Sequence, residues 1–403
     1  MSKKNNKVVL AYSGGLDTSF CVKYLTEEKG LEVYAMTVNT GGFSEGQIKD
    51  IEKRAYAIGV KEYIAKDITE SFYDQCLKYL LFGNVLKNNT YPLSVSAERV
   101  FQAIAIAEYA KSIDAAYVAH GSTGAGNDQV RFDMIFNIVI PSAEILTPIR
   151  DLRLSREEEI EYLAKKGVHI DAEKAKYSIN QGIWGTSVGG KETLTSNQTL
   201  PDNAYPTPLT KEGTEDITIT FEKGEPIALN GKKYQHSSHL IQDLEKIAAP
   251  YAVGRDVHVG DTVIGIKGRV GFEAAAPLIL IKAHHLLEKH TLSKQQLIWK
   301  DFLASPYGNF LHDGLFFEPA MRDIEAFLTS TQAHVSGNVT VRLSPYRFIT
   351  VGIQSPYDLM QSKFGSYGEM NNTWTGDDVR GFAKIFSNQI MIYTRVKEQV
   401  ENK

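Results

Sequence analysis

The residue types between Ser13 and Ser19 could bind a chain of phosphates. This stretch, SGGLDTS, contains two adjacent glycines and three hydroxyl side chains, and it lies between a short apolar run and an amphipathic pattern. Adjacent glycines allow backbone N–H groups to point at a ligand, and a helix N-terminus carries a partial positive charge. The stretch therefore predicts an anion cradle at a strand-to-helix turn.

Asp17 narrows the choice of anion. A carboxylate in the first turn of a phosphate-binding helix is repelled by its ligand unless a divalent cation lies between them. We therefore expect a polyphosphate with bound Mg2+, and Asp17 as a ligand of the metal. The stretch has neither the Gly-Lys-Ser/Thr of P-loop enzymes nor a third glycine at the dinucleotide spacing. A tight turn capped by Ser13, without any ligand, is the alternative.

A second polar segment, HGSTGAGNDQVRFD at 120–133, could bind an amino acid. Asp128 offers a carboxylate for an ammonium group, and Arg131 offers a planar fork for a carboxylate or an amide-like group. Asn127 can donate and accept beside them. The alternative for this segment is a polar surface loop with no ligand.

Alternating strands and helices must position both segments. We expect strands at 7–12, 32–39, 61–68 and 115–120, with helices at 44–58, 69–82, 96–111 and 155–166. Capping boxes predict two of the helix starts, at Ser44 and Ser155. The alternation predicts a parallel sheet covered by helices on both faces, and ligands then bind beyond the carboxyl ends of its strands. SGGLDTS, VNTGG (38–42) and HGSTG all fall there, so one pocket could contain all three.

The second half of the chain has a different pattern. Period-two alternation predicts strands around 217–221 and 227–229 and a hairpin at 339–351, whereas 240–247 and 275–303 have helical spacing. This is typical of an α+β domain. The final stretch, 387–403, has one apolar stripe of Ile392, Val396 and Val400. A short helix of this kind is marginal alone, so it should dock on another surface.

Composition excludes several classes of protein. The net charge of -4 and the pI near 6.2 show no general basic character, which argues against nucleic acid as a partner. No stretch approaches 18 apolar residues and no signal-peptide pattern occurs, so we expect a soluble protein without a membrane partner. Cys21 and Cys76 form no CxxC pair, and we interpret them as reduced core thiols of a cytoplasmic protein.

SGGLDTS resembles the pyrophosphate loop (PP-loop) of the N-type ATP pyrophosphatases, which cleave ATP between its α and β phosphates. Further motifs make the resemblance specific to the argininosuccinate synthase family. They are AYSGGLDTS at 11–19, Tyr91 and Ser96 in TYPLSVSAER, HGSTGAGNDQVRF at 120–132, YSINQGIWGTS at 177–187 and GRDVHVGDTVIGIKGRVGFE at 254–273. These motifs occur in the family's order and at similar spacing, and the similarity covers nearly the whole chain.

The resemblance implies ATP-driven joining of citrulline and aspartate in arginine biosynthesis, with release of AMP and pyrophosphate through a citrullyl-adenylate. ATP and Mg2+ would be required. It implies a Rossmann-like PP-loop nucleotide-binding domain at 1–168, an α+β synthetase and oligomerisation domain at 169–370, and a C-terminal oligomerisation tail at 371–403. In the family such a tail packs across subunits of a homotetramer, and docking on its own subunit is the alternative.

The family's site residues can be carried over to matching positions of this chain. Those expected to act in catalysis are Asp17, Asp128 and Arg131. Those expected to bind ATP are Ala11, Tyr12, Ser13, Gly14, Gly15, Leu16, Asp17, Thr18, Ser19, Val38 and Gly121. Those expected to bind citrulline are Tyr91, Ser96, Asn127, Arg131, Ser178 and Ser187, and those expected to bind aspartate are Thr123, Asn127 and Asp128.

The chain departs from the family pattern at three places. Ala125 stands where many relatives have lysine, Gly260-Asp261-Thr262 replaces a common Glu-Asn-Arg, and Phe272 replaces a tyrosine. The glutamate and tyrosine positions belong to the citrulline end of the family's site. A lost carboxylate could mean a citrulline whose amine is acylated. The interpretation we favour is plain citrulline held by other contacts.

Two other functions compete with this one. A PP-loop enzyme that modifies tRNA would adenylate a base by the same logic, but it predicts a basic surface or catalytic cysteines. A non-catalytic nucleotide or amino-acid sensor could keep the fold, yet SGGLDTS and NDQVR (127–131) are intact. Release of pyrophosphate that depends on both amino acids would exclude the sensor.

Overall fold

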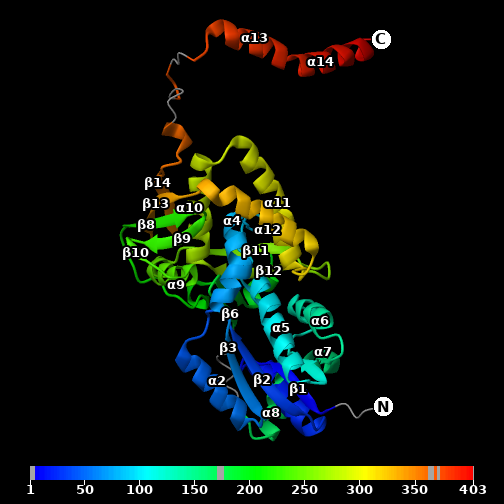
Figure 1. Cartoon of the computed structure of the whole chain (residues 1–403). Helices are drawn as coiled ribbons and strands as arrows, with labels where there is room; N and C mark the ends of the chain where they lie inside the picture. Colours follow the sequence, from blue (N-terminus) through cyan, green and yellow to red (C-terminus); the bar gives the residue numbers. More distant parts are fainter. Residues whose placement is uncertain (1–4, 170–176, 362–366, 370–372, 403) are drawn as a thin grey trace. The chain divides into compact units, whose positions relative to one another are not determined.

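The structure is a computed structural model that describes residues 5–169, 177–361, 367–369 and 373–402 (Figure 1). The chain forms two compact units, residues 1–356 and 357–403, which are described separately below. Within the described residues, no helix is both long enough and apolar enough to cross a membrane.

A five-stranded parallel sheet forms the first part of unit 1. Its order is β3-β2-β1-β4-β5, and every neighbouring pair is parallel. The strands are β1 (Lys7–Ala11), β2 (Glu32–Asn39), β3 (Glu62–Asp67), β4 (Tyr117–Ala119) and β5 (Glu144–Leu146). The chain first adds strands on one side of β1 and then on the other. The gap between the ends of β1 and β4 is therefore the point where such sheets bind ligands.

Helices cover both faces of this sheet, as predicted. The helices in this part of the chain are α1 (Leu16–Lys23), α2 (Glu45–Ala57), α3 (Thr69–Phe72), α4 (Lys78–Phe82), α5 (Ser94–Ser112), α6 (Asp128–Val139), α7 (Pro148–Leu152) and α8 (Arg156–Lys165), of which α4 packs against helices of the later half. Both predicted capping boxes are present, at Ser44 and Ser155. The predicted helix at 69–82 is continuous but contains a π-helical segment, Tyr73–Leu77, between α3 and α4.

Alternate side chains of β1 enter different cores. Val8 and Leu10 pack with residues of α1 and α2, whereas Val9 belongs to a second cluster that includes residues of α5. The second cluster also contains Ile217 and Val339 from the later half of the chain. The two halves of unit 1 therefore share one continuous core.

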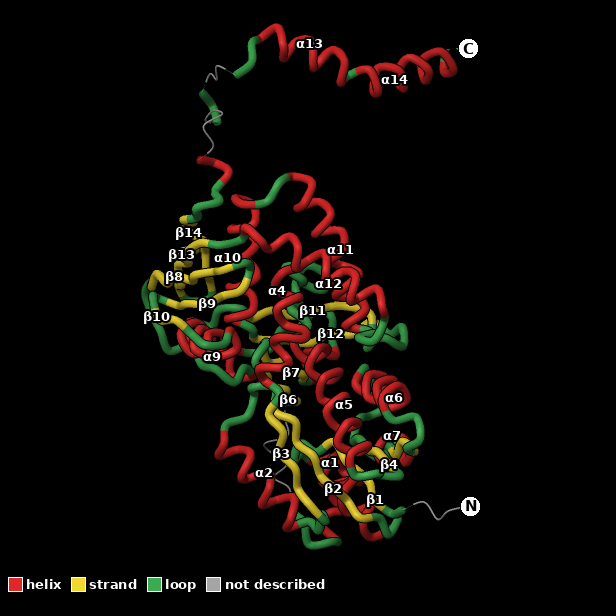
Figure 2. The backbone as a smooth tube through the Cα atoms, in the orientation of Figure 1, coloured by secondary structure: helices red, strands yellow, loops and turns green. Residues whose placement is uncertain are grey.

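Two antiparallel sheets follow (Figure 2). The period-two pattern predicts strands of only one of them, the sheet that contains residues 217–229 and 339–351. One has the order β10-β9-β8-β13-β14 and the other β11-β12-β7-β6. The strands are β6 (Ser178–Gly182), β7 (Gly185–Gly189), β8 (Glu215–Glu222), β9 (Glu225–Leu229), β10 (Lys232–Lys233), β11 (Arg255–Asp261), β12 (Lys267–Glu273), β13 (Gly337–Ser344) and β14 (Arg347–Gln354). The predicted strands around 217–221 and 227–229 and the predicted hairpin at 339–351 are confirmed.

Four helices accompany these sheets: α9 (Ser237–Ala248), α10 (Ala275–Thr291), α11 (Lys294–His312) and α12 (Pro319–Thr331). The predicted helical stretch at 275–303 is in fact two helices. Leu292 is extended, and Ser293 caps α11 through a capping box with Gln296. A serine followed three residues later by glutamine signals this break in the sequence.

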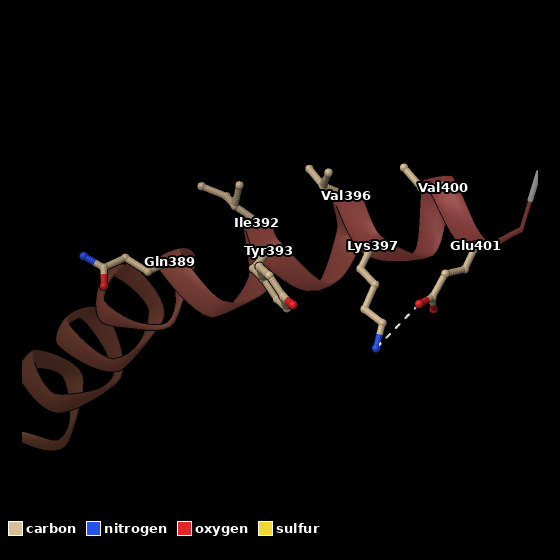
Figure 3. A pocket seen from close by; sticks show the side chains of 7 residues that line it. All are labelled: Gln389, Ile392, Tyr393, Val396, Lys397, Val400 and Glu401. Carbon is tan, nitrogen blue, oxygen red and sulfur yellow. Dashed lines mark ion pairs between the residues drawn. The ribbon is translucent and has the colours of Figure 1, made fainter.

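The described residues of unit 2 include two α-helices, α13 (Gly376–Phe386) and α14 (Asn388–Glu401), and neither has a buried residue. Ile392, Val396 and Val400 project from one side of α14, and the Lys397–Glu401 pair lies on another side (Figure 3). The predicted apolar stripe is confirmed, and all three of its side chains are more than half exposed.

Candidate active site

The SGG segment forms the turn between β1 and α1. Gly14 has a φ of 72°, a conformation that favours glycine, and Gly15 is the N-cap of α1. Ser13 Oγ lies 3.3 Å from Thr18 Oγ1, so two hydroxyls meet at this helix start. Arg54 of α2 donates from Nη1 to the Gly14 carbonyl at 2.9 Å. Arg54 thus fixes the turn through the Gly14 carbonyl. The hydroxyls of the turn and the N-terminus of α1 remain available to an anion.

Asp17 lies between this turn and α8. Burial raises the pKa of Asp17, and the charge of Arg156 opposes this shift only in part. Burial and the nearby Asp17 charge raise the pKa of Glu159 on α8 to about 8. Two carboxyl groups therefore face one another beside the phosphate turn. Such a pair favours a bound cation or a shared proton.

The loop that follows β4 packs against the start of α1. A Cβ at Gly121 would lie 3.4 Å from the Asp17 Cβ and 3.4 Å from Thr18 Cγ2. This contact brings the predicted amino-acid loop to the phosphate turn. Gln129 orders the loop, since its Nε2 donates to the carbonyls of Gly124 (2.6 Å) and Gly126 (3.2 Å).

Asp128 is the first residue of α6, and two guanidinium groups hold it. Arg99 Nε lies 2.9 Å from Oδ2, and Arg131 Nη1 lies 3.1 Å from Oδ1. Burial alone would raise the pKa of Asp128, but the two arginines hold it below its ordinary value. Asp128 is therefore a carboxylate at neutral pH, and about a third of its side chain is exposed.

Arg131 is buried and bonds to three groups of the protein. Besides Asp128, it donates from Nη2 to Ser96 Oγ (3.1 Å) and from Nε to the carbonyl of His312 (2.9 Å). Its guanidinium thus connects α5, α6 and the end of α11. In this arrangement the hydrogen bonds of Arg131 orient Asp128 and Ser96, and direct binding of a ligand would be an additional role.

His120, at the end of β4, has a defined tautomer. Ser122 N–H donates to His120 Nδ1 at 3.2 Å, so Nε2 carries the proton and donates to Asp133 Oδ1 at 2.9 Å. Arg150 Nη1 binds the other Asp133 oxygen at 2.7 Å. Burial alone would raise the pKa of Asp133, but the bonds from His120 and Arg150 lower it. This cluster fastens α6 to the loop that carries Gly121.

Tyr91 and the sheet β11-β12-β7-β6 form the remaining side of the candidate site. The buried Tyr91 hydroxyl lies 3.0 Å from Ser94 Oγ, and its ring is 5.4 Å from the ring of Phe272. Phe272 pairs with Ser187 in the β12–β7 register. Phe272 is fully buried, so it packs beside Tyr91 as part of the core rather than presenting a polar group.

His258 occupies the space next to Gly260. Its ring is 5.1 Å from that of Tyr91, and a Cβ at Gly260 would lie only 2.5 Å from His258 Nε2. Burial, together with the charges of His312 and Lys87, lowers the pKa of His258 to about 4, so the imidazole is neutral at physiological pH. A side chain at position 260 would have to displace this histidine.

The structure brings most of the predicted site residues into these clusters. Asn127 precedes α6 and accepts from Val263 N–H at 2.8 Å, and the Val38 carbonyl accepts from Gln102 at 3.5 Å. Ser178 and Thr123 are exposed, and neither contacts Arg131 or Asp128 in the bonds given above. The sequence prediction did not include Arg99, Glu98, Glu159 or His258. Arg99 lies within the TYPLSVSAER motif, one turn after Ser96, which was its only signal.

The fold and the site define a class of protein: an α/β ligase with a HUP-type nucleotide-binding region followed by a region of antiparallel sheets. Residues 7–169 match the model described as the arginosuccinate synthase N-terminal HUP domain, and residues 177–393 match the arginosuccinate synthase C-terminal domain. The chain belongs to the argininosuccinate synthase family.

Individual relatives support this assignment. The chain is 37% identical to the argininosuccinate synthase of Dictyoglomus turgidum over 392 residues, which cover 97% of this chain and 98% of the relative. It is 36% identical to that of Methanocaldococcus jannaschii over 394 residues, with coverage of 97% and 98%. For Pyrococcus furiosus the identity is 36% over 390 residues, with coverage of 96% and 94%.

Proposed function

We propose that this chain joins citrulline and aspartate to form argininosuccinate, with ATP cleaved to AMP and pyrophosphate through a citrullyl-adenylate. The observation that carries the proposal is the contact of Gly121 with Asp17 and Thr18. It connects the loop that bears Asp128 and Arg131 to the helix start that would hold ATP. Phosphate chemistry and amino-acid recognition would then occur side by side at the β1–β4 switch point.

The phosphate turn would stabilise pyrophosphate as it leaves. Backbone N–H groups at the start of α1 and the hydroxyls of Ser13 and Thr18 are donors that need no reorganisation when negative charge develops. We propose Ser19 as a further ATP contact. The other ATP contacts that we propose are Ala11, Tyr12, Gly14, Gly15, Leu16, Asp17, Val38 and Gly121. Catalysis by these residues would consist of positioning and charge stabilisation.

The two amino acids would bind across the Asp128 network. We propose that Tyr91, Ser96, Asn127, Arg131, Ser178 and Ser187 hold citrulline, and that Thr123, Asn127 and Asp128 hold aspartate. The ureido oxygen of citrulline would attack the α-phosphorus, and the aspartate amine would then displace AMP. Neither cysteine serves as a nucleophile in this scheme, since Cys21 and Cys76 are buried and burial raises the pKa of both thiols.

Mg2+ fits the residues beside the turn. Asp17 and Glu159 are two acidic groups close together at the start of a phosphate-binding helix, and Mg2+ is commonly bound through one or two carboxylates together with substrate phosphates. We propose Asp17 as the ligand from this chain, with Glu159 behind it. The ion would supply positive charge that offsets the charge of the polyphosphate.

At the citrulline end we propose plain citrulline, bound without a carboxylate at position 260. His258 already fills the space over Gly260, and Phe272 packs on Tyr91. The alternative is an N-acylated citrulline, because Gly260 supplies no carboxylate for an ammonium group and Lys87 adds positive charge near His258.

One assay tests both the reaction and the substrate. We expect pyrophosphate release from ATP to require citrulline and aspartate together, with one pyrophosphate per argininosuccinate. Reactions that lack one amino acid, and reactions with N-acetylcitrulline in place of citrulline, run in parallel. Release that is independent of citrulline and aspartate would contradict the proposed reaction. A higher kcat/KM for N-acetylcitrulline than for citrulline would show that the acylated compound is the substrate.

We further propose a cytoplasmic homotetramer in which 371–403 serves as an oligomerisation tail attached to a nucleotide-binding domain (1–168) and a synthetase domain (169–370). The two buried free thiols suit a reducing compartment. Helix α14 exposes Ile392 (63%) and Val400 (69%), and a 14-residue helix is marginal in water without a partner.

Deleting 387–403 is expected to reduce the mass measured by light scattering from that of four chains to that of a smaller species. The matched control is Lys397→Ser, which changes the polar side of α14 and should leave the mass unchanged. A deletion variant that keeps the wild-type mass would show that the tail docks on its own subunit or is not needed for assembly.

A further inference from the structure

Glu98 is a buried carboxyl group near the Thr40 hydroxyl, and its two oxygens lack well-aligned hydrogen bonds within the described part of the chain. It lies on α5 between Ser96 and Arg99, and its side chain is fully buried. The Thr40 hydroxyl lies close enough to lower the pKa of Glu98, but neither Oε1 nor Oε2 forms a hydrogen bond of good geometry with any residue that the structure describes. Burying a polar group without a partner is costly, and such groups in folded proteins commonly have a functional reason. A reactant at the candidate site could supply the missing partner.

A glycine packs directly against the Glu98 carboxyl group. A Cβ at Gly182, the last residue of β6 before the turn to β7, would lie 1.5 Å from Glu98 Oε1, so this carboxyl group requires glycine at 182. The same turn is joined to the loop after β2, since Ile183 N–H donates to the Thr40 carbonyl at 2.9 Å. A Cβ at Gly42 would meet the Gln181 carbonyl at 2.1 Å. Three segments of the site therefore converge on Glu98.

Burial and the charges around Glu98 bring its pKa close to neutral pH, so the protonated carboxyl group and the carboxylate that can accept a proton are both accessible. Burial raises its pKa to about 8, Arg99 and the Thr40 hydroxyl lower it in part, and the Asp128 charge raises it. Tyr91 is the other ionisable side chain in electrostatic contact with Glu98. The overlying turn, Gln181 to Ile183, contributes no ionisable side chain. Arg99 also binds Asp128, so the proposed aspartate-binding carboxylate and Glu98 flank the same guanidinium.

We propose that Glu98 is the catalytic residue that accepts a proton from the aspartate amine in the second half of the reaction. The inference rests on the proposed function. Aspartate arrives as an ammonium ion, which has no electron pair with which to attack. One N–H bond breaks and its proton moves to a Glu98 oxygen, and the freed pair forms the C–N bond to the ureido carbon. The C–O bond to the adenylate breaks, its electron pair leaves with AMP, and the remaining excess proton on the new nitrogen passes to water.

Glu98→Gln separates the two half-reactions. Exchange of labelled pyrophosphate into ATP in the presence of citrulline alone reports adenylate formation, and we expect the variant to keep this exchange near the wild-type rate. Argininosuccinate formation should fall about 10²- to 10⁴-fold, the usual contribution of a general base. In the variant the remaining rate should rise with pH as more of the aspartate amine becomes neutral. Glu98→Asp, which keeps a carboxyl group, should recover part of the lost rate.

A matched control is Glu245→Gln on α9. Burial likewise raises the pKa of Glu245, to about 7, but Glu245 accepts a hydrogen bond from Ala276 N–H at 2.7 Å, away from the site. This variant should leave both half-reactions unchanged. Normal argininosuccinate formation by Glu98→Gln, or an equal loss of exchange and overall rate, would overturn the role of Glu98. A wild-type protein without citrulline-dependent exchange would instead overturn the proposed function.

Discussion

Arg131→Ala is expected to lower argininosuccinate formation about 10²- to 10³-fold, the usual effect of losing one preorganised donor at a developing charge. The substitution removes three hydrogen bonds, to Asp128, Ser96 and the His312 carbonyl. The Asp128 carboxylate would keep the ion pair with Arg99 but lose the one with Arg131. Its orientation would be less fixed, and its pKa would be lowered less. The measurement is kcat/KM for citrulline and for aspartate.

The same substitution should reduce the unfolding free energy by about 3 kcal/mol, as expected when one partner of a buried ion pair is removed. The matched control is Arg342→Ala. Arg342 binds both oxygens of Asp216, but this pair is nearly half exposed and joins β8 and β13 outside the site. Loss of an exposed pair should cost at most about 1 kcal/mol and leave kcat/KM unchanged. A normal kcat/KM in Arg131→Ala would show that Arg131 is not part of the active site.

Gly14→Ala should abolish most of the pyrophosphate chemistry, with a fall of about 10²-fold or more in citrulline-dependent pyrophosphate exchange. Gly14 has a positive φ, where an alanine is strained by about 1–2 kcal/mol. The added Cβ would lie 3.1 Å from Arg54 Nη2, so it would also disturb the arginine that holds the Gly14 carbonyl. The N–H groups at the start of α1 would then point away from the phosphates.

Gly59→Ala provides the control for backbone strain. Gly59 also has a positive φ, 98°, and nothing lies within 4 Å of an added Cβ there. Both variants should lose a similar amount of thermal stability, measured as the shift in Tm, while only Gly14→Ala should lose exchange activity. Equal activity in the two variants would show that the turn tolerates strain and does not cradle ATP.

Four of the five strands of the N-terminal sheet were predictable because their signals are local, whereas β5 was not predicted. The apolar run before SGG, the capping boxes at Ser44 and Ser155 and the helical periodicities each involve residues close in sequence, and each occurs where predicted. The break between α10 and α11 was missed, although Ser293 and Gln296 form a third capping box. Periodicity alone does not distinguish one long helix from two consecutive helices with similar faces.

The partners of the site residues were much less predictable. Arg131 was expected to face a substrate, yet its bonds in this structure go to α5, α6 and α11. Gly182 and Glu98 are 84 positions apart, and no local pattern links them, but a Cβ on one would overlap the carboxyl group of the other. The same holds for His258 and Gly260. The sequence shows a glycine at 260, but only the structure shows that the His258 ring occupies the space that a side chain there would need.

The sequence by itself determined the alternation of strands and helices in the first part of the chain, the glycine turn at the start of α1 and the motifs that place the chain in its family. These depend on backbone preferences and periodicities over a few residues. Only the tertiary structure decided which groups share charge and space: Asp17 with Glu159, Asp128 with Arg99, and Glu98 with Gly182. Burial and electrostatic interaction act through distance in space, and chain position alone does not specify that distance.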